Sequence, residues 1–428
     1  MAYDLILIAG KDPLEGRGGH SVYVRMWAHA ARRAGFAPHL FCVSHGRGKI
    51  DTEYATVHRI HSPLSWLPNR HMTGFRTHMI VWHMGLLAKA IASFARARKR
   101  PCLLHGIGPW STVTPRAKLL LYRSRIPCRM VMTSYTTLAH EYIAKHHGVT
   151  RTHGILPRFR MSWEMLCLRL ILDRAEKRAY RQSDMVLVNY ESVRRILERQ
   201  WGRGPRIRKV PYTTEGAMLT GRVPLSSRGP MAAISRLGPP ESPLVVSVSR
   251  HDPRKGLDVL IRALGRLKDR RVRFRACLVS SGFLIEAHRK LVQSLGLQER
   301  VAIPGYVEDI RPYLRAADIF ALPSLEEGSG SLSLLEAMQE GKPAVASGVD
   351  GLPEDVEHGG SGLLVAPRDD DALARALERL IEDAALRRRF GARGREIFEE
   401  RFSPDAVVRA LREVYDEVMR PLGPIGCT

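Results

Sequence analysis

Arg250, Lys255, Glu327 and Glu336 are the charged residues of this chain whose types and positions point to chemistry. The two cations follow the apolar run Leu244–Val248. A guanidinium and an ammonium at the end of a strand can neutralise a departing diphosphate, although a basic loop by itself is usually just solvated. Carboxylates do not favour a phosphate, but they accept hydrogen bonds from sugar hydroxyls. Together, the four residues indicate a ligand that carries both a diphosphate and a sugar.

The glutamates belong to residues 322–348, LPSLEEGSGSLSLLEAMQEGKPAVASG. An apolar run, a Gly/Ser loop, a helical segment over 332–339 and a second apolar run follow one another, which is typical of a parallel sheet. Gly328 and Gly330 let backbone N–H groups approach a ligand where the helix begins. The pattern predicts a cradle for a nucleotide and a sugar, and an ordinary turn with an acidic N-cap is the alternative.

A second glycine-rich loop follows the first apolar run, Tyr3–Ala9. The sequence GKDPLEGRGGH leads into the helical pattern Ser21–Ala34 and the strand pattern Phe36–Val43. Gly18 and Gly19 are thereby placed at a helix N-terminus, which suits a diphosphate. The motif is not GxGxxG, so a tight turn fits it equally well.

Polar residues follow two more strand-like runs, Cys102–His105 and Arg129–Thr133. Ligands of open α/β sheets bind at the carboxyl ends of the strands, so these residues are candidates for lining an acceptor cleft. Each of them could instead be a structural polar residue. The candidates are His105, Tyr135, Thr136 and His140.

Composition and pattern divide the chain of 428 residues into two α/β domains. Strands alternate with helices on both sides of a stretch rich in Gly, Pro, Ser and Arg. We expect a first Rossmann-like domain over 1–205, a linker over 206–243, a second Rossmann-like domain over 244–405 and a helical tail over 406–428. Each domain should contain a doubly wound parallel sheet, and the two should face a cleft.

The positive charge is concentrated in the first half. The formal net charge is +24, of which residues 1–200 contribute +20. An anionic membrane, a phosphorylated acceptor or nucleic acid would suit such a surface, and an arginine-rich solvated surface is the alternative. No RRM, KH or zinc-finger pattern is present, so we expect no specific nucleic acid partner. The helical pattern that starts at Phe75 and includes Trp82 could touch a membrane, but such stripes more often pack on a sheet.

Cysteine usage and the apolar runs indicate the compartment. The six cysteines are scattered without a CxxC motif, which indicates reduced thiols. The N-terminus MAYDLILIAG has no basic leader, and no apolar run approaches the length of a membrane span. We therefore expect a cytoplasmic protein, or one that is peripheral at the inner membrane face.

The chain resembles the family-4 retaining glycosyltransferases over roughly residues 244–415. The segments that carry the resemblance are SVSRHDPRKGLDVLIRAL, IPGYVEDIRPYLRAADIFALPSLEEGSGSLSLLEAM, GKPAVASGVDGLPEDVEHGGSGLLV and REIFEERFSPDAVVRALREVYDEVM. A weaker likeness over residues 1–200 rests on GRGGHSVYVRMWAHAARRAGFAPHLFCV. The resemblance implies the GT-B fold, with an acceptor-binding first domain, a second domain that binds the nucleotide diphosphate-sugar, and a C-terminal helix that returns to the first domain.

The resemblance also implies roles for the matching residues. Arg250 and Lys255 resemble the family's pair on the donor phosphates, and Glu327 resembles a glutamate near the donor sugar. Glu336 resembles the carboxylate on the ribose hydroxyls. The implied catalytic residues are Arg250, Lys255 and Glu327. The implied donor-binding residues are Gly18, Gly19, Arg250, Lys255, Glu327, Ser329, Gly330, Ser331 and Glu336.

Two features depart from the family pattern. The family has seven residues between its two glutamates, whereas eight separate Glu327 from Glu336. The family often has a histidine after the strand that ends here at Thr133. This chain has Tyr135 there and His140 five residues later, and the sequence leaves open which of them replaces the histidine.

The implied activity is retaining transfer of a sugar from a nucleotide diphosphate-sugar, with UDP the most frequent nucleotide, to an acceptor hydroxyl. The basic first half favours a lipid-linked or phosphorylated glycan, as in envelope polysaccharide or glycolipid biosynthesis. A small soluble acceptor, such as an aminocyclitol or a natural-product aglycone, is the alternative, and a GT-B nucleotide-sugar epimerase is a more distant one. Two cations can replace a metal and no DxD motif ends a strand, so we expect no metal or cofactor.

The role implied for Glu336 predicts a binding defect. Glu336→Ala should mainly raise the KM for the donor and leave kcat nearly unchanged, because contacts to the ribose act in the ground state and the transition state alike. Steady-state kinetics with varied donor would test this. A large loss of kcat at unchanged KM would instead place Glu336 in the chemical step.

Overall fold

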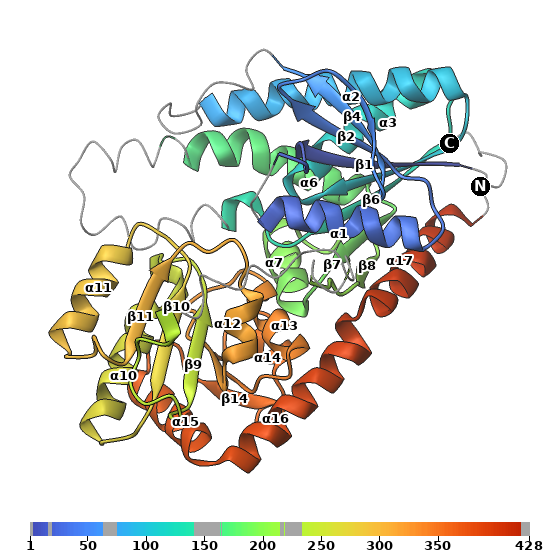
Figure 1. The fold of residues 1–428 in the computed structure, drawn as a ribbon. Helices are drawn as coiled ribbons and strands as arrows, with labels where there is room; N and C mark the ends of the chain where they lie inside the picture. Colours follow the sequence, from blue (N-terminus) through green and yellow to red (C-terminus); the bar gives the residue numbers. More distant parts are fainter. Residues whose placement is uncertain are drawn as a thin grey trace. The chain divides into compact units, whose positions relative to one another are not determined.

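The computed structural model describes residues 3–15, 19–62, 75–140, 163, 165–214, 218 and 233–420 (Figure 1). The chain divides into two compact units. The first contains Met1–Met218 together with Pro404–Thr428, and the second contains Leu219–Ser403. Each unit is built on one sheet with helices on its faces, which confirms the expected α/β class.

The first unit contains an eight-stranded sheet in the order β3-β4-β2-β1-β5-β6-β7-β8. Neighbouring strands run parallel except for β3 and β4. The strands are β1 (Asp4–Lys11), β2 (His39–Ser44), β3 (Gly48–Asp51), β4 (Thr56–His61), β5 (Cys102–Ile107), β6 (Cys128–Ser134), β7 (Met185–Val188) and β8 (Ile207–Lys209). The parallel order follows from the helices that alternate with the strands along the chain.

Helices α2 and α3 cover one face of this sheet. Ile6 and Ile8 of β1 share a core with Leu87 and Ile91 of α2 and with Leu121 of α3. Successive residues of a strand point to opposite faces of the sheet, so Ile6 and Ile8 point to the same face. Helix α1 also packs against β1. The helical elements are α1 (Gly19–Arg33), α2 (Phe75–Arg98), η1 (Gly108–Val113), α3 (Thr114–Arg123), η2 (Leu168–Asp173), α6 (Arg174–Gln182) and α7 (Glu191–Trp201).

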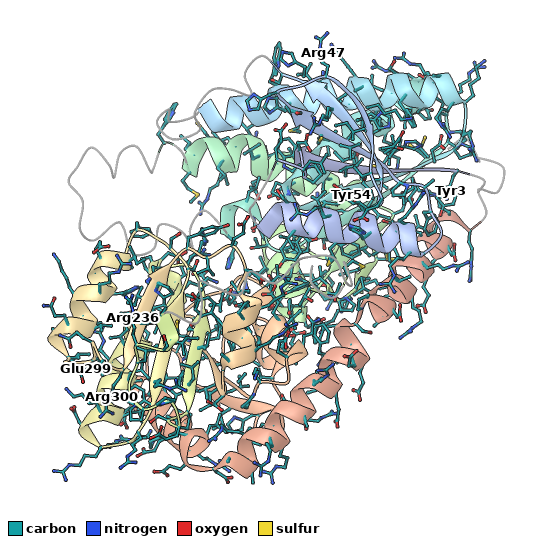
Figure 2. All side chains as sticks on the ribbon, viewed as in Figure 1. Tyr3, Arg47, Tyr54, Arg236, Glu299 and Arg300 are labelled. Atoms are coloured by element: carbon teal, nitrogen blue, oxygen red, sulfur yellow. The ribbon has the colours of Figure 1, made fainter. Side chains whose placement is uncertain are left out.

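Helix α17 (Pro404–Met419) packs against α1 in the first unit, as Figure 1 shows. The hydroxyl of Tyr415 lies 2.6 Å from Nδ1 of His105, and Nε2 of His105 lies 2.6 Å from the hydroxyl of Thr133. Phe36 contacts the Tyr415 ring and the ring of Tyr3, which is labelled in Figure 2. The last helix is thereby fixed to β5 through buried polar groups, and to Phe36 and Tyr3 through aromatic contacts.

The second unit contains a six-stranded parallel sheet in the order β11-β10-β9-β12-β13-β14. Its strands are β9 (Leu244–Val248), β10 (Arg275–Val279), β11 (Val301–Gly305), β12 (Ile319–Leu322), β13 (Ala344–Ser347) and β14 (Gly362–Val365). Its helical elements are η3 (Pro253–Lys255), α10 (Leu257–Asp269), α11 (Ile285–Ser294), α12 (Arg311–Ala316), α13 (Leu332–Gln339), α14 (Leu352–Asp355), α15 (Asp370–Glu382), α16 (Ala384–Ile397) and η4 (Phe398–Phe402).

Two features differ in detail from the sequence expectation. The linker was expected from residue 206, but β8 pairs with β7 and extends the first sheet beyond that point. Helix α2 packs on the sheet through Leu87 and Ile91 in its middle. Trp82, in the N-terminal half of the helix, is 54% exposed. Its packing therefore buries one stretch of the helix and leaves an aromatic side chain in solvent.

Burial of His105 predicts a pH-dependent stability. Burial lowers the pKa of His105 from 6.5 to about 3. Between these pH values the unfolded chain binds a proton that the folded chain does not, so the free energy of unfolding falls as the pH falls from 6.5. The loss should reach about 2 kcal/mol at pH 5, since one pKa unit corresponds to about 1.4 kcal/mol.

Urea unfolding at pH 7.5 and pH 5 would measure this effect. His105→Gln keeps a polar side chain but cannot take up the proton, so its stability should change less between the two pH values. An unchanged difference in the variant would assign the pH dependence to other histidines, such as His58, whose pKa is lowered by burial to about 4.

Candidate active site

Two loops at the carboxyl edge of the second sheet form the candidate site. The first connects β9 to α10 and contains Arg250 and Lys255. Asp252 caps its short η3 helix, because its side chain accepts a hydrogen bond from the backbone N–H of Arg254 at 3.1 Å. Gly256 then takes the left-handed conformation with φ of 59°. This turn starts α10 and points the preceding residues toward the neighbouring loop.

The second loop connects β12 to α13 and contains Glu327. It lies directly against the first loop, because the carbonyl oxygen of Arg254 accepts from the N–H groups of Leu325 at 2.7 Å and Glu326 at 3.3 Å. A Cβ on Gly256 would lie 2.2 Å from the carbonyl oxygen of Pro323. Only glycine therefore allows the two loops to approach this closely.

Lys255 and Glu327 form an ion pair where the loops meet. Nζ of Lys255 lies 2.6 Å from Oε2 of Glu327, and the two side chains are only 14% and 4% exposed. The other carboxylate oxygen of Glu327 accepts a hydrogen bond from the hydroxyl of Ser324. Glu327 thus holds Lys255 in place, and an ammonium with three N–H donors still has donors for a phosphate.

Asp350 fixes the backbone of the glutamate loop, a role that the sequence analysis missed. It follows β13, and Oδ2 accepts from the N–H groups of Glu327 at 2.6 Å and Gly328 at 2.8 Å. Gly351 adds a bond of 2.7 Å to the carbonyl oxygen of Ser329. The Asp-Gly pair after the next strand was the available signal, because carboxyl ends of parallel strands meet at one edge.

The other expected donor-site residues also lie around this loop. Arg250 has a side chain that is 60% exposed, and its Nη2 lies 3.2 Å from Oδ2 of Asp252. Ser329, Gly330 and Ser331 are buried in the loop. The Ser331 hydroxyl lies 3.0 Å from that of Ser333. One short loop between β9 and α10 carries both Arg250 and Lys255.

Glu336 lies on α13 and is half-buried. The pKa of Arg311 is raised first by a hydrogen bond from its guanidinium to Asp309, and the Glu336 charge contributes to this rise. Glu336 therefore lies in a neighbourhood that also holds a cation.

Among the first-unit candidates, His105 is not available to a ligand. Its side chain is fully buried and both ring nitrogens are occupied by Tyr415 and Thr133. The expectation that it lines an acceptor cleft is corrected, because it links the core to α17 instead. Of the glycines, Gly19 is the first residue of α1, and Gly18 lies outside the described residues.

Tyr135 and Thr136 lie in an aromatic cluster at the carboxyl edge of the first sheet. The Tyr135 ring stacks on Tyr23 with a centroid distance of 4.2 Å, and its hydroxyl accepts a hydrogen bond from Nε1 of Trp27. Burial holds the pKa of Tyr135 well above its usual value of 10. Tyr23 also contacts Tyr212 edge to face. A phenol with such a pKa is a neutral hydrogen-bonding group, not a base.

His140 lies in the helical turn that starts at Leu138, and its backbone N–H donates to the hydroxyl of Thr137 at 3.2 Å. Two further residues were missed by the sequence analysis. Asn189 directly follows β7 and Thr213 follows β8, both are almost fully buried, and within the described ranges their side-chain polar atoms have no hydrogen-bond partner. Buried polar atoms are rarely left unpaired, so a water molecule or another polar group is expected beside them.

The described ranges contain no cluster of three or more His, Cys, Asp or Glu side chains able to hold a metal ion. In the same ranges, no helix has the length and apolar character needed to cross a bilayer.

Comparison with known proteins matches both halves of the chain to glycosyltransferase families. Residues 18–213 match the model described as "Glycosyl transferase 4-like domain", and residues 242–383 match "Glycosyl transferases group 1". The second match contains both loops of the candidate site. The chain belongs to the family-4 GT-B glycosyltransferases.

Several relatives illustrate the family. The chain is 31% identical over 236 residues to a lipopolysaccharide core biosynthesis glycosyltransferase, LpsE of Rhizobium meliloti, covering 55% of this chain and 65% of that protein. It is 33% identical over 250 residues to a D-inositol 3-phosphate glycosyltransferase of Streptomyces bingchenggensis, covering 56% and 54%. The chain thus matches less than two thirds of the length of these relatives.

A solved structure confirms the fold over nearly the whole chain. Sucrose-phosphate synthase from Thermosynechococcus elongatus superposes with a TM-score of 0.73 at 24% sequence identity, covering 97% of this chain and 99% of that one. At this identity the likeness establishes the GT-B fold of this glycosyltransferase family member and not its substrates.

The buried ion pair predicts a test for Lys255. Lys255→Ala should lower turnover by about 10²-fold or more, because it removes a charge that stabilises the leaving group. It also leaves the Glu327 carboxylate buried without its partner, which by itself costs about 3–5 kcal/mol of stability. Turnover and thermal unfolding should therefore be measured together.

The double variant Lys255→Met/Glu327→Leu separates the two effects. Removing both charges should restore stability while turnover stays low. Recovery of turnover would show that Lys255 acts only in folding. Arg262→Ala is the matched control, since it removes an exposed cation of the same unit that forms an ion pair with Asp258 on the surface of α10.

Proposed function

We propose that the chain is a retaining glycosyltransferase that moves a sugar from a nucleotide diphosphate-sugar to an acceptor hydroxyl. The observation that carries this proposal is Lys255, which Glu327 holds at 2.6 Å at the carboxyl edge of the second sheet. Arg250 projects from the same loop with a largely exposed side chain. The site thus offers a fixed, buried cation and a largely exposed one to a ligand with two phosphates.

The proposed chemistry uses these cations on the leaving group. The bond between the anomeric carbon and the diphosphate oxygen breaks, and a bond to the acceptor oxygen forms on the same face of the sugar. The departing phosphate oxygen takes the acceptor's proton. Arg250 and Lys255 offset the charge that develops on the diphosphate, so the protein contributes positioning and electrostatic stabilisation. Two cations supply the charge that a metal would otherwise provide.

The remaining donor contacts follow the family pattern. Glu336 on α13 would accept hydrogen bonds from the ribose, and Ser329 to Ser331 would present the loop backbone to the donor. Gly18 and Gly19 remain proposed contacts to the diphosphate, as the family pattern implies. UDP is the first nucleotide to test.

The acceptor would bind at the carboxyl edge of the first sheet. Tyr23 and Tyr135 offer an aromatic surface, and Asn189 and Thr213 offer unpaired polar atoms within the described ranges. Sugars pair with both kinds of group, because they carry hydroxyls and apolar ring faces. A lipid-linked or phosphorylated glycan at the cytoplasmic membrane face agrees with the excess of +20 over residues 1–200 and with the named role of the LpsE relative.

A second candidate is a small soluble acceptor. The relative named for D-inositol 3-phosphate glycosylation favours a phosphorylated cyclitol, which the same basic unit would attract. The candidates differ in whether the acceptor carries a lipid.

Calorimetry with UDP, GDP and ADP, followed by their sugars, tests the proposal. One nucleotide should bind saturably, and Lys255→Ala should weaken it. Incubation with acceptors should then give a product whose anomeric configuration, measured by proton NMR, matches that of the donor. Inversion would exclude the retaining route, and donor turnover to an isomeric nucleotide-sugar without acceptor would favour an epimerase.

A further inference from the structure

The first unit contains a long acid-free stretch. Between Glu53 and Glu141 the sequence has thirteen Lys and Arg but no Asp or Glu. Helices α2 and α3 fall within it and pack against each other on one face of the first sheet. α6 contacts α3 beside them. Seven of these thirteen cations lie on α2 and α3, so this pair of helices carries positive charge and no acidic residue.

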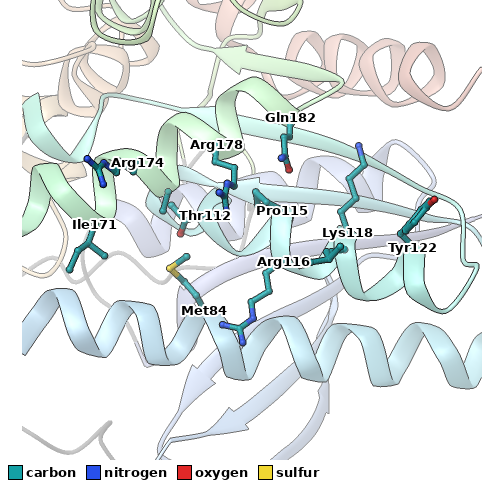
Figure 3. A pocket seen from close by; sticks show the side chains of 12 residues that line it. Met84, Thr112, Pro115, Arg116, Lys118, Tyr122, Ile171, Arg174, Arg178 and Gln182 are labelled. Carbon is teal, nitrogen blue, oxygen red and sulfur yellow. The ribbon is translucent and has the colours of Figure 1, made fainter. Parts of the chain in front are cut away.

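A cavity of about 840 Å³ lies among these helices. Its lining includes four cations, Arg116 and Lys118 from α3 and Arg174 and Arg178 from α6, and no acidic residue. Figure 3 shows the arginines of α6 on one side of the cavity and Arg116 on the other, with Met84 of α2 between them. The cavity thus forms a basic groove.

The charges of the basic groove are poorly compensated. Lys118 Nζ is 4.0 Å from Oδ2 of Asp184, whose carboxylate already binds Arg129 at 2.8 Å. Within the described ranges, the side chains of Arg116, Arg174 and Arg178 have no ion pair or hydrogen bond. Arg174 and Arg178 are four residues apart on one helix, where like charges repel. An anion in the groove would relieve this repulsion.

Exposed apolar side chains border the basic groove. Leu119 and Tyr122, which line it, are 50% and 76% exposed. Trp82 is 54% exposed and lies three residues before Gly85, whose Cβ position is 3.3 Å from the Arg116 guanidinium. Trp82 and Gly85 therefore share one helix face. Leu170, 48% exposed, lies one turn before Arg174.

We propose that the basic groove and its apolar border form a membrane-docking surface that binds the phosphate groups of anionic lipids in a bilayer. The four cations meet the headgroups, while Trp82, Leu119 and Tyr122 enter the boundary between headgroups and acyl chains. Nucleic acid would match the charge, but it offers no apolar phase for the aliphatic side chains. The inference rests on the lipid-linked acceptor of the proposed function, and it places that acceptor's membrane beside α2, α3 and α6.

Vesicle sedimentation with the full chain at low salt tests this surface. The protein should bind phosphatidylcholine vesicles that contain roughly one third phosphatidylglycerol, and bind pure phosphatidylcholine weakly. Arg174→Gln/Arg178→Gln should weaken binding by about 25-fold, because each cation near an anionic surface contributes about fivefold. Trp82→Ala/Tyr122→Ala should remove the part of the binding that survives high salt.

The matched control is Arg388→Gln/Arg389→Gln, which removes the same charge from exposed positions on α16 of the second unit. Thermal unfolding establishes that every variant is folded. Equal weakening by control and groove variants, or none by the groove variants, would overturn the inference. It would also be overturned if a short DNA duplex bound more tightly than the vesicles and lost binding in the groove variants.

The outcomes separate this inference from the proposed function. Nucleotide binding should be the same in the groove variants and the wild-type chain, because the groove lies outside the donor site. Groove-dependent vesicle binding without any sugar transfer would support the inference and count against the proposed function. Sugar transfer without vesicle binding would support the proposed function and overturn the membrane-docking inference.

Discussion

The ion pair between Lys255 and Glu327 depends on two loops that are brought together at one sheet edge. Gly256 permits the contact, the Arg254 carbonyl oxygen accepts from the second loop, and Asp350 holds that loop from the following strand. A buried ion pair often fails to offset the desolvation of its charges. Its presence here is therefore better explained by the position that it gives to a cation than by stability alone.

The position of that cation gives the second unit its chemical character. A lysine whose carboxylate partner is itself held by Ser324 has little freedom to turn away, so the ammonium is oriented before a ligand arrives. Such preorganisation is what electrostatic stabilisation of a leaving group requires. Arg250 complements it with an exposed guanidinium on the same loop.

The first unit combines a closed interior with a charged outer surface. His105 and Tyr415 fix the last helix to the central strands by a hydrogen bond in the core. Helices α3 and α6 carry arginines whose side chains have no ion pair among the described residues, and α2 and α3 carry exposed aromatic side chains. The same sheet thus presents polar and aromatic groups at its carboxyl edge and a basic, partly apolar surface on its helices.

The sequence by itself determined the local elements and the chemistry of the donor site. Helix α13 begins and ends at the residues expected, and the alternating pattern predicted five of the six parallel strands of the second unit, all except β14. Periodicity and glycine positions act over a few neighbouring residues, so they can be read from the chain alone. Arg250, Lys255 and Glu327 could be identified as candidate site residues for the same reason, because each follows an apolar run that the sequence shows directly.

Only the tertiary structure decided which of these residues touch. Lys255 meets Glu327 and Asp350 caps the glutamate loop because separate strands end at one edge, and no local pattern specifies such contacts. His105 followed a strand as a ligand residue would, yet α17 covers it from the far end of the chain. The basic groove likewise exists only once three helices pack together, since burial and pairing depend on residues that are distant in sequence.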